Sequence, residues 1–90
     1  MHITTMHTLA FTIRAHNGRH QLAEDTIKIS AETIGVDLIE REYLPLPEGE
    51  TSAIRSTKIL VRSTDLDRLE SYWNELQRAL ALVGVEATSP

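Results

Sequence analysis

The chain contains no cysteine, few aromatic residues and fewer basic than acidic residues. The absence of cysteine excludes disulfide bonds and thiolate chemistry. A formal net charge of −4 argues against non-specific binding to nucleic acids or anionic membranes, because both favour a basic surface. No apolar run approaches the length of a membrane-spanning helix, and the first residues lack the pattern of a signal peptide. We therefore expect a soluble, cytoplasmic protein that does not bind membranes.

The remaining composition is typical of a folded globular protein. Hydrophobic residues make up 41% of the 90 residues and charged residues 24%. These proportions are ordinary for a folded domain and unlike those of a disordered segment. The length corresponds to one domain, so we expect residues 1–90 to share a single hydrophobic core.

The stretch Thr8–His16 alternates between apolar and polar residues, which is typical of a strand with one buried side. Its apolar positions are Leu9, Phe11, Ile13 and Ala15. Asn17 and Gly18 follow directly and predict a turn, in which Asn17 caps the next helix.

Helical periodicity extends from Leu22 to Ile34. A broad stripe of apolar and small residues, which includes Leu22 and Ile29, is expected to face a sheet. Glu24 falls on the other side, where its spacing to Lys28 predicts an exposed ion pair. Gly35 is placed to end the helix in the left-handed conformation.

Val36–Leu44 predicts the second strand, and both of its faces carry apolar side chains. The connection that follows contains Pro45 and Pro47, which exclude regular strand pairing. It is also longer than a tight hairpin requires. We expect this connection to contact a partner protein or a second subunit through Leu44 and Leu46.

The second half repeats the same order of elements. Ala53–Ser63 predicts a strand, Thr64 predicts a helix cap together with Asp67, and Val85–Thr88 predicts a short last strand. The intervening helix is expected to end at Gly84. Its predicted sheet-facing residues are Leu66, Leu69, Trp73, Leu76, Leu80 and Val83.

The predicted order of elements is therefore β-α-β-β-α-β. With right-handed crossovers, both helices cover one face of an antiparallel sheet with the spatial order 4-1-3-2, which is the ferredoxin-like α+β fold. Neither half can bury the apolar side of its helix alone, so the repeat predicts one two-layer domain.

The sheet face opposite the helices is expected to combine apolar and basic side chains. Alternation places on it Thr12, Arg14, Ile39, Arg41, Tyr43, Lys58, Leu60 and Arg62. Three interpretations stay open. The face is solvated, since soluble surfaces contain many apolar atoms; or it forms a homodimer that buries Ile39, Tyr43 and Leu60; or it binds single-stranded RNA. One aromatic residue and a negative net charge disfavour RNA.

No catalytic, metal-binding or phosphate-binding motif stands out, so we expect a non-enzymatic interaction or regulatory module without cofactor or metal. We expect it to form a homodimer through its sheet and to bind a partner protein or a small ligand. The four histidines lack metal-binding spacing and are expected at the surface. The predicted interface residues are Ile39, Arg41, Tyr43, Leu44, Leu46, Leu60 and Arg62. The alternative is a small dimeric α+β-barrel enzyme that acts on a hydrophobic substrate. Its pocket, between helices and sheet, would be lined by Trp73, Asn74, His16 and His20.

Residues 8–43 resemble an ACT-type regulatory domain. The resemblance rests on a strand that ends in Ala15-His16-Asn17-Gly18, on Leu22 early in the helix, and on Gly35 followed by the extended segment Val36–Ile39. It implies a module that binds a small molecule or another subunit. The ligand would then lie near Asn17, Gly18 and Leu22, at a dimer interface.

Overall fold

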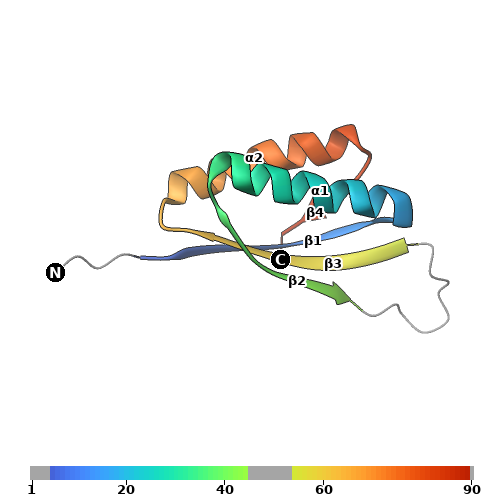
Figure 1. Ribbon diagram of the computed structural model, residues 1–90, viewed down its shortest axis with the longest axis horizontal. Coiled ribbons are helices and arrows are strands. Elements are labelled where there is room, and N and C mark those ends of the chain that lie inside the picture. Colours follow the sequence, from blue (N-terminus) through green and yellow to red (C-terminus); the bar gives the residue numbers. More distant parts are fainter. Residues whose placement is uncertain (1–4, 45–53, 90) are drawn as a thin grey trace.

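The computed structural model of the protein describes residues 5–44 and 54–89. The elements are β1 (His7–His16), α1 (Asn17–Ile34), β2 (Asp37–Leu44), β3 (Ile54–Ser63), α2 (Leu66–Leu82) and β4 (Glu86–Thr88). Both helices lie on the same face of a four-stranded sheet (Figure 1). The strand order is β2-β3-β1-β4, and all neighbouring strands are antiparallel. The predicted ferredoxin-like fold is therefore confirmed, including its strand order.

β1 and β3 form the centre of the sheet because their helix-facing positions are mostly apolar. Phe11, Ile13, Ile59 and Val61 are almost completely buried. The helices cover them with Ala23, Ile27, Ala31, Leu69, Tyr72, Leu76 and Leu80. Burial of one large apolar side chain contributes about 1.5–3 kcal/mol, so this layer supplies most of the stabilisation. Within the described residues, neither helix has the length and apolar character to cross a membrane.

α1 begins at Asn17, earlier than its periodicity indicates, so the predicted turn at Asn17-Gly18 is wrong. His16 holds the N-cap position, and among the described residues no side chain caps the helix. Leu22 and Ile29 are 52% and 62% exposed, because α1 turns Ala23, Ile27 and Ala31 toward the sheet instead. Gly35 ends the helix with a φ of 87°, as predicted.

α2 also differs from its predicted orientation. Asp65, rather than Thr64, caps the helix by accepting a hydrogen bond of 3.1 Å from the backbone N–H of Arg68. Tyr72 faces α1 and the sheet, and its hydroxyl donates to the carbonyl of Ile27 at 3.3 Å. Burial raises the pKa of the Tyr72 phenol above its ordinary value. Trp73, predicted to face the sheet, is only half-buried.

A β-bulge in β2 changes which of its side chains face the helices. Leu38 pairs with Val61 and Glu40 pairs with Leu60, so Ile39 and Glu40 oppose a single residue of β3. Because side chains alternate along a strand, this extra residue reverses the faces of everything that follows in β2.

Arg41 and Tyr43 consequently lie on the helix side of the sheet. Arg41 stands opposite Ile59 and Tyr43 opposite Thr57, and both partners are buried beneath the helices. The Tyr43 ring also lies 6.0 Å from the ring of His20 on α1. The expectation that both residues occupy the open face is therefore wrong.

The open face alternates in charge rather than being basic. Asp37 stands opposite Arg62, with 3.9 Å between its Oδ2 and the Nε of Arg62, and Glu42 stands opposite Lys58. Leu60 lies between these pairs and is half-buried. The bulge removes the ring of Tyr43 and the cation of Arg41 from this face. A carboxylate stands opposite each of the three remaining cations, Arg14, Lys58 and Arg62. This surface is therefore less suited to RNA than the sequence indicates.

Candidate functional site

Two arginines and a histidine gather where β1 meets α1. Arg14 and His16 lie at the end of β1, and Arg19 lies in the first turn of α1. Together with Ala15, Ile54 and Gly84 they line a hollow of about 240 Å³, which we call the basic corner. The topology assembles this site because the start of α1 comes to lie beside the end of α2.

Gly84 gives the Arg19 guanidinium the space that it occupies. A Cβ atom at Gly84 would collide with Nη1 of Arg19, and Gly84 has a φ of 72°, which other residues rarely adopt. The backbone N–H groups of Gly84 and Val85 bond to carbonyls in the last turn of α2. The same glycine therefore ends α2 and admits Arg19 to the corner.

The basic corner has the electrostatics of an anion site. Within residues 5–44 and 54–89, neither Arg14 nor Arg19 forms an ion pair, although Glu86 stands opposite Arg14 across β1 and β4. The first turn of α1 contains no acidic residue. The uncapped N–H groups and the dipole of a helix N-terminus favour negative charge, and arginine binds carboxylates and phosphates in bidentate geometry.

Close to this corner, His20 forms a buried polar cluster with Glu24 and Thr57. Its Nε2 lies 2.6 Å from Oγ1 of Thr57, and its Nδ1 lies 4.0 Å from Oε1 of Glu24. Among the described residues, that carboxylate oxygen has no hydrogen-bond partner. The expectations of a surface His20 and an exposed Glu24 are both wrong. Thr57 is completely buried, so no substrate can reach its hydroxyl and the cluster is structural.

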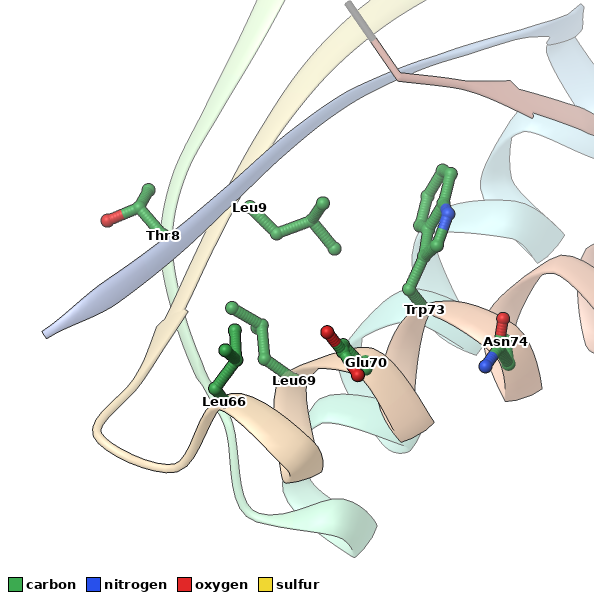
Figure 2. A pocket seen from close by; sticks show the side chains of 7 residues that line it. All are labelled: Thr8, Leu9, Leu66, Leu69, Glu70, Trp73 and Asn74. Carbon is green, nitrogen blue, oxygen red and sulfur yellow. The ribbon is translucent and has the colours of Figure 1, made fainter.

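A second hollow, of about 340 Å³, lies between β1 and α2; we call it the edge groove. Its lining residues are Thr8, Leu9, Leu66, Leu69, Glu70, Trp73 and Asn74. Figure 2 shows Leu9 and Trp73 projecting into the space between the strand and the helix. The centroids of the Trp73 and Phe11 rings are 5.1 Å apart. This contact packs Trp73 against the core.

Only two of the four residues expected to line the pocket of an enzyme lie at the edge groove. Trp73 and Asn74 line the edge groove, as the enzyme alternative expects. His16 lies instead at the basic corner, and His20 is buried against Thr57. No histidine therefore joins the tryptophan and the amide, and Glu70 is the one titratable side chain among the described lining residues. The described part of the chain also contains no group of three or more metal-ligating side chains.

The residues implied by the ACT resemblance lie along the start of α1. Asn17 begins the helix, and Gly18 and Leu22 are exposed on it. A Cβ atom at Gly18 would meet nothing within 4 Å, so packing does not require glycine there. Arg19 is not among the site residues that the sequence indicates, and Arg14 is expected only as part of the open face. The feature of the sequence that could have indicated this corner is the presence of Arg14, His16 and Arg19 close to one strand–helix junction.

The predicted interface residues are distributed over two faces. Ile39, Leu44, Leu60 and Arg62 belong to the open side of β2 and β3, whereas Arg41 and Tyr43 face the helices. Leu46 and most of the predicted contact loop lie outside the described residues. The interface role of these residues stays a prediction.

No protein-family model matches the chain, and no curated protein matches it in sequence. Solved structures do match. The de novo designed protein Foldit4 has a TM-score of 0.74 at 12% identity, and the match covers 96% of this chain and 99% of that one. The C-terminal domain of the MgtC protein from Mycobacterium tuberculosis has a TM-score of 0.67 at 9% identity, with 100% and 94% covered.

The ACT domain of the GTP pyrophosphokinase from Chlorobium tepidum has a TM-score of 0.57 at 14% identity. The match covers 93% of this chain and all of that domain, 100%. Identities this low show a shared fold and nothing further. At the level of fold, the resemblance to ACT-type domains that residues 8–43 indicate is therefore confirmed.

Proposed function

We propose that the protein is a small interaction or regulatory module that binds a small anionic ligand at the basic corner and forms a homodimer through its sheet. The observation that carries the ligand proposal is the convergence of Arg14, Arg19 and the start of α1 on one hollow. Hydrogen bonds to charged groups contribute about 1.5–3 kcal/mol, which favours an anion over a neutral ligand.

The size of the basic corner restricts the ligand. Its volume of about 240 Å³ lies below the roughly 300–1,000 Å³ of pockets for drug-sized molecules. The hollow therefore suits a phosphate group or a small carboxylic acid. Asn17 and Gly18 begin the same helix, so a ligand here would also lie near two of the residues that the ACT resemblance implies.

The ligand proposal is tested by titrating the protein with inorganic phosphate and with citrate in a calorimeter at constant ionic strength. Arg19→Gln removes one guanidinium and is expected to weaken binding by about tenfold or more, as the loss of a charge-assisted contact predicts. Arg78→Gln on the exposed side of α2 removes the same charge elsewhere and serves as the control. Absence of binding to the unmodified protein, or equal losses in both variants, would refute the proposal.

Charge complementarity on the open face supports the homodimer. β2 presents Asp37, Glu40 and Glu42 beside the basic residues Lys58 and Arg62 of β3. In a two-fold symmetric contact, each acidic row can meet the basic row of the other copy. Between these rows, Ile39 is 43% exposed and Leu60 is half-buried, so a second copy would remove apolar surface from water.

A further inference from the structure

β4 covers only part of the outer edge of β1. β3 pairs with β1 along its whole length from His7 to His16, whereas β4 pairs only with Thr12, Ile13 and Arg14. Figure 1 shows the first half of β1 extending past the last strand. Among the residues that the structure describes, no strand therefore pairs with the outer edge of β1 between His7 and Phe11.

The hydrogen-bonding groups of this edge can be assigned by alternation. The hydroxyl of Thr88 donates to the carbonyl of Thr12 at 3.5 Å, so the Thr12 carbonyl is directed toward the β4 side. Backbone directions alternate along a strand, so Thr8 and Ala10 direct their N–H and C=O groups to the same side. An unpaired row of this kind is a template for another strand.

The edge groove lies beside this unpaired segment. Thr8 and Leu9 line it from β1, while Leu66, Leu69 and Trp73 line it from α2 (Figure 2). Leu66 is 46% exposed, so the groove presents apolar surface to water. Side chains of an added strand would alternate between the open face and the groove, so backbone pairing and apolar pockets are available at one place.

The charges of the groove select its occupant. Among the described lining residues, Glu70 is the only charged one. A neighbouring hollow along α2 and β4 is lined by Glu86, which stands opposite Arg14 of β1, and by no basic side chain. A two-fold contact between the grooves of two copies would bring their Glu70 carboxylates together, and like charges at an interface disfavour that contact. A basic segment of another protein is complementary.

We propose that the free edge of β1 and the edge groove bind an extended peptide segment of a partner protein. The segment adds to the sheet as a further strand, places apolar side chains against Leu66, Leu69 and Trp73, and pairs a lysine or arginine with Glu70. This surface is separate from the basic corner and from the open face. If no peptide binds at the edge groove, the proposed function is therefore unaffected.

The probe is a capped heptapeptide with valine at alternate positions, threonine between them and one lysine. A matched peptide carries glutamate in place of the lysine. Trp73 is the only tryptophan of the chain, so its emission reports on the groove directly. We expect the lysine peptide to shift this emission saturably and the glutamate peptide to bind at least tenfold more weakly. Equal binding of both peptides, or no binding of either, would overturn the proposal.

A charge exchange distinguishes the groove from the rest of the surface. Glu70→Lys is expected to invert the preference, so that the glutamate peptide binds at least tenfold better than the lysine peptide. Glu75→Lys, on an exposed position of α2 that does not line the groove, is the matched control and should leave the preference unchanged. Inversion by the control variant as well would mean that net charge, and not Glu70, decides binding.

Strand addition is tested by N-methylating the peptide, because this leaves the protein unaltered. Methylation of the amides that face β1 should abolish binding, whereas methylation of the alternate amides should reduce it little. Equal binding of both methylated peptides would overturn strand addition in favour of simple apolar binding. The alternative occupant of the groove is a second copy of the protein, and light scattering of the protein alone tests for it. A dimer that Glu70→Lys abolishes would assign the groove to a second copy and overturn the proposal.

Discussion

Thr57 is the polar residue on which the buried cluster depends. It occupies a core position of β3, and its hydroxyl is the partner of the His20 Nε2 at 2.6 Å. An unpaired polar atom in a core is costly, so a residue at this point has to satisfy the imidazole. Thr57 therefore stabilises the domain through one hydrogen bond that its apolar neighbours in the sheet cannot replace.

Thr57→Val tests this role, because valine keeps the branched shape and β-propensity of threonine but lacks the hydroxyl. We expect the free energy of unfolding in urea to fall by about 1–3 kcal/mol, since the buried Nε2 of His20 loses its partner. Thr64→Val at an exposed position is the control and should change stability by less than about 0.5 kcal/mol. An unchanged Thr57→Val variant would show that the hydrogen bond does not stabilise the fold.

At the scale of the element, the helix ends determine how the layers meet. Gly35 and Gly84 both have positive φ, and each follows a helix whose next residues enter a strand. Gly18 lies instead inside the first turn of α1, where its surroundings are open. Gly35 and Gly84 therefore need the left-handed conformation that glycine allows, whereas Gly18 does not. The same substitution, glycine to alanine, should have opposite effects at Gly84 and Gly18.

Gly84→Ala is expected to lower the free energy of unfolding by about 1–2 kcal/mol, the cost of a left-handed conformation at a non-glycine residue. It should also weaken phosphate binding, because the new Cβ displaces the Arg19 guanidinium. Gly18→Ala is expected to raise stability, by up to about 1 kcal/mol, since alanine favours helix. Both values are read from urea unfolding, and a stabilising Gly84→Ala would contradict the assigned role of Gly84.

For the whole molecule, the open face of the sheet determines whether the protein is a monomer or a dimer. The helices cover one side of the sheet, and the other side exposes charge pairs around Leu60. Surface ion pairs within one copy contribute at most about 1 kcal/mol each to stability. Exchanging them for ion pairs with a second copy therefore costs little. A dimer would remove Leu60 and Ile39 from water.

Light scattering at micromolar concentration should therefore give the mass of a dimer for the unmodified protein. Leu60→Asp is expected to give a monomer with an unchanged circular dichroism spectrum, because a charge buried in the contact is costly. Leu82→Asp makes the same change at a residue that is 89% exposed on α2, and it should leave the dimer intact. A strictly monomeric unmodified protein would remove the sheet dimer.

The sequence by itself determined the order of the elements and the side of β1 and β3 that faces the helices. Both follow from local rules: alternation has a period of two, helices have a period of 3.6, and glycine ends helices. The repeat then restricted the ways in which two helices can cover one sheet. For this reason the strand order was predictable without any long-range contact.

Only the tertiary structure decided the details that carry function. The bulge at Ile39 reverses Arg41 and Tyr43, and it depends on pairing with β3 rather than on the pattern of β2 itself. Helical periodicity predicts that Trp73 faces the sheet, whereas the structure buries Tyr72, whose hydroxyl donates a hydrogen bond to α1. The basic corner, the buried cluster and the edge groove each join residues from separate elements. Their physical cause is the approach of distant segments, which no local pattern encodes.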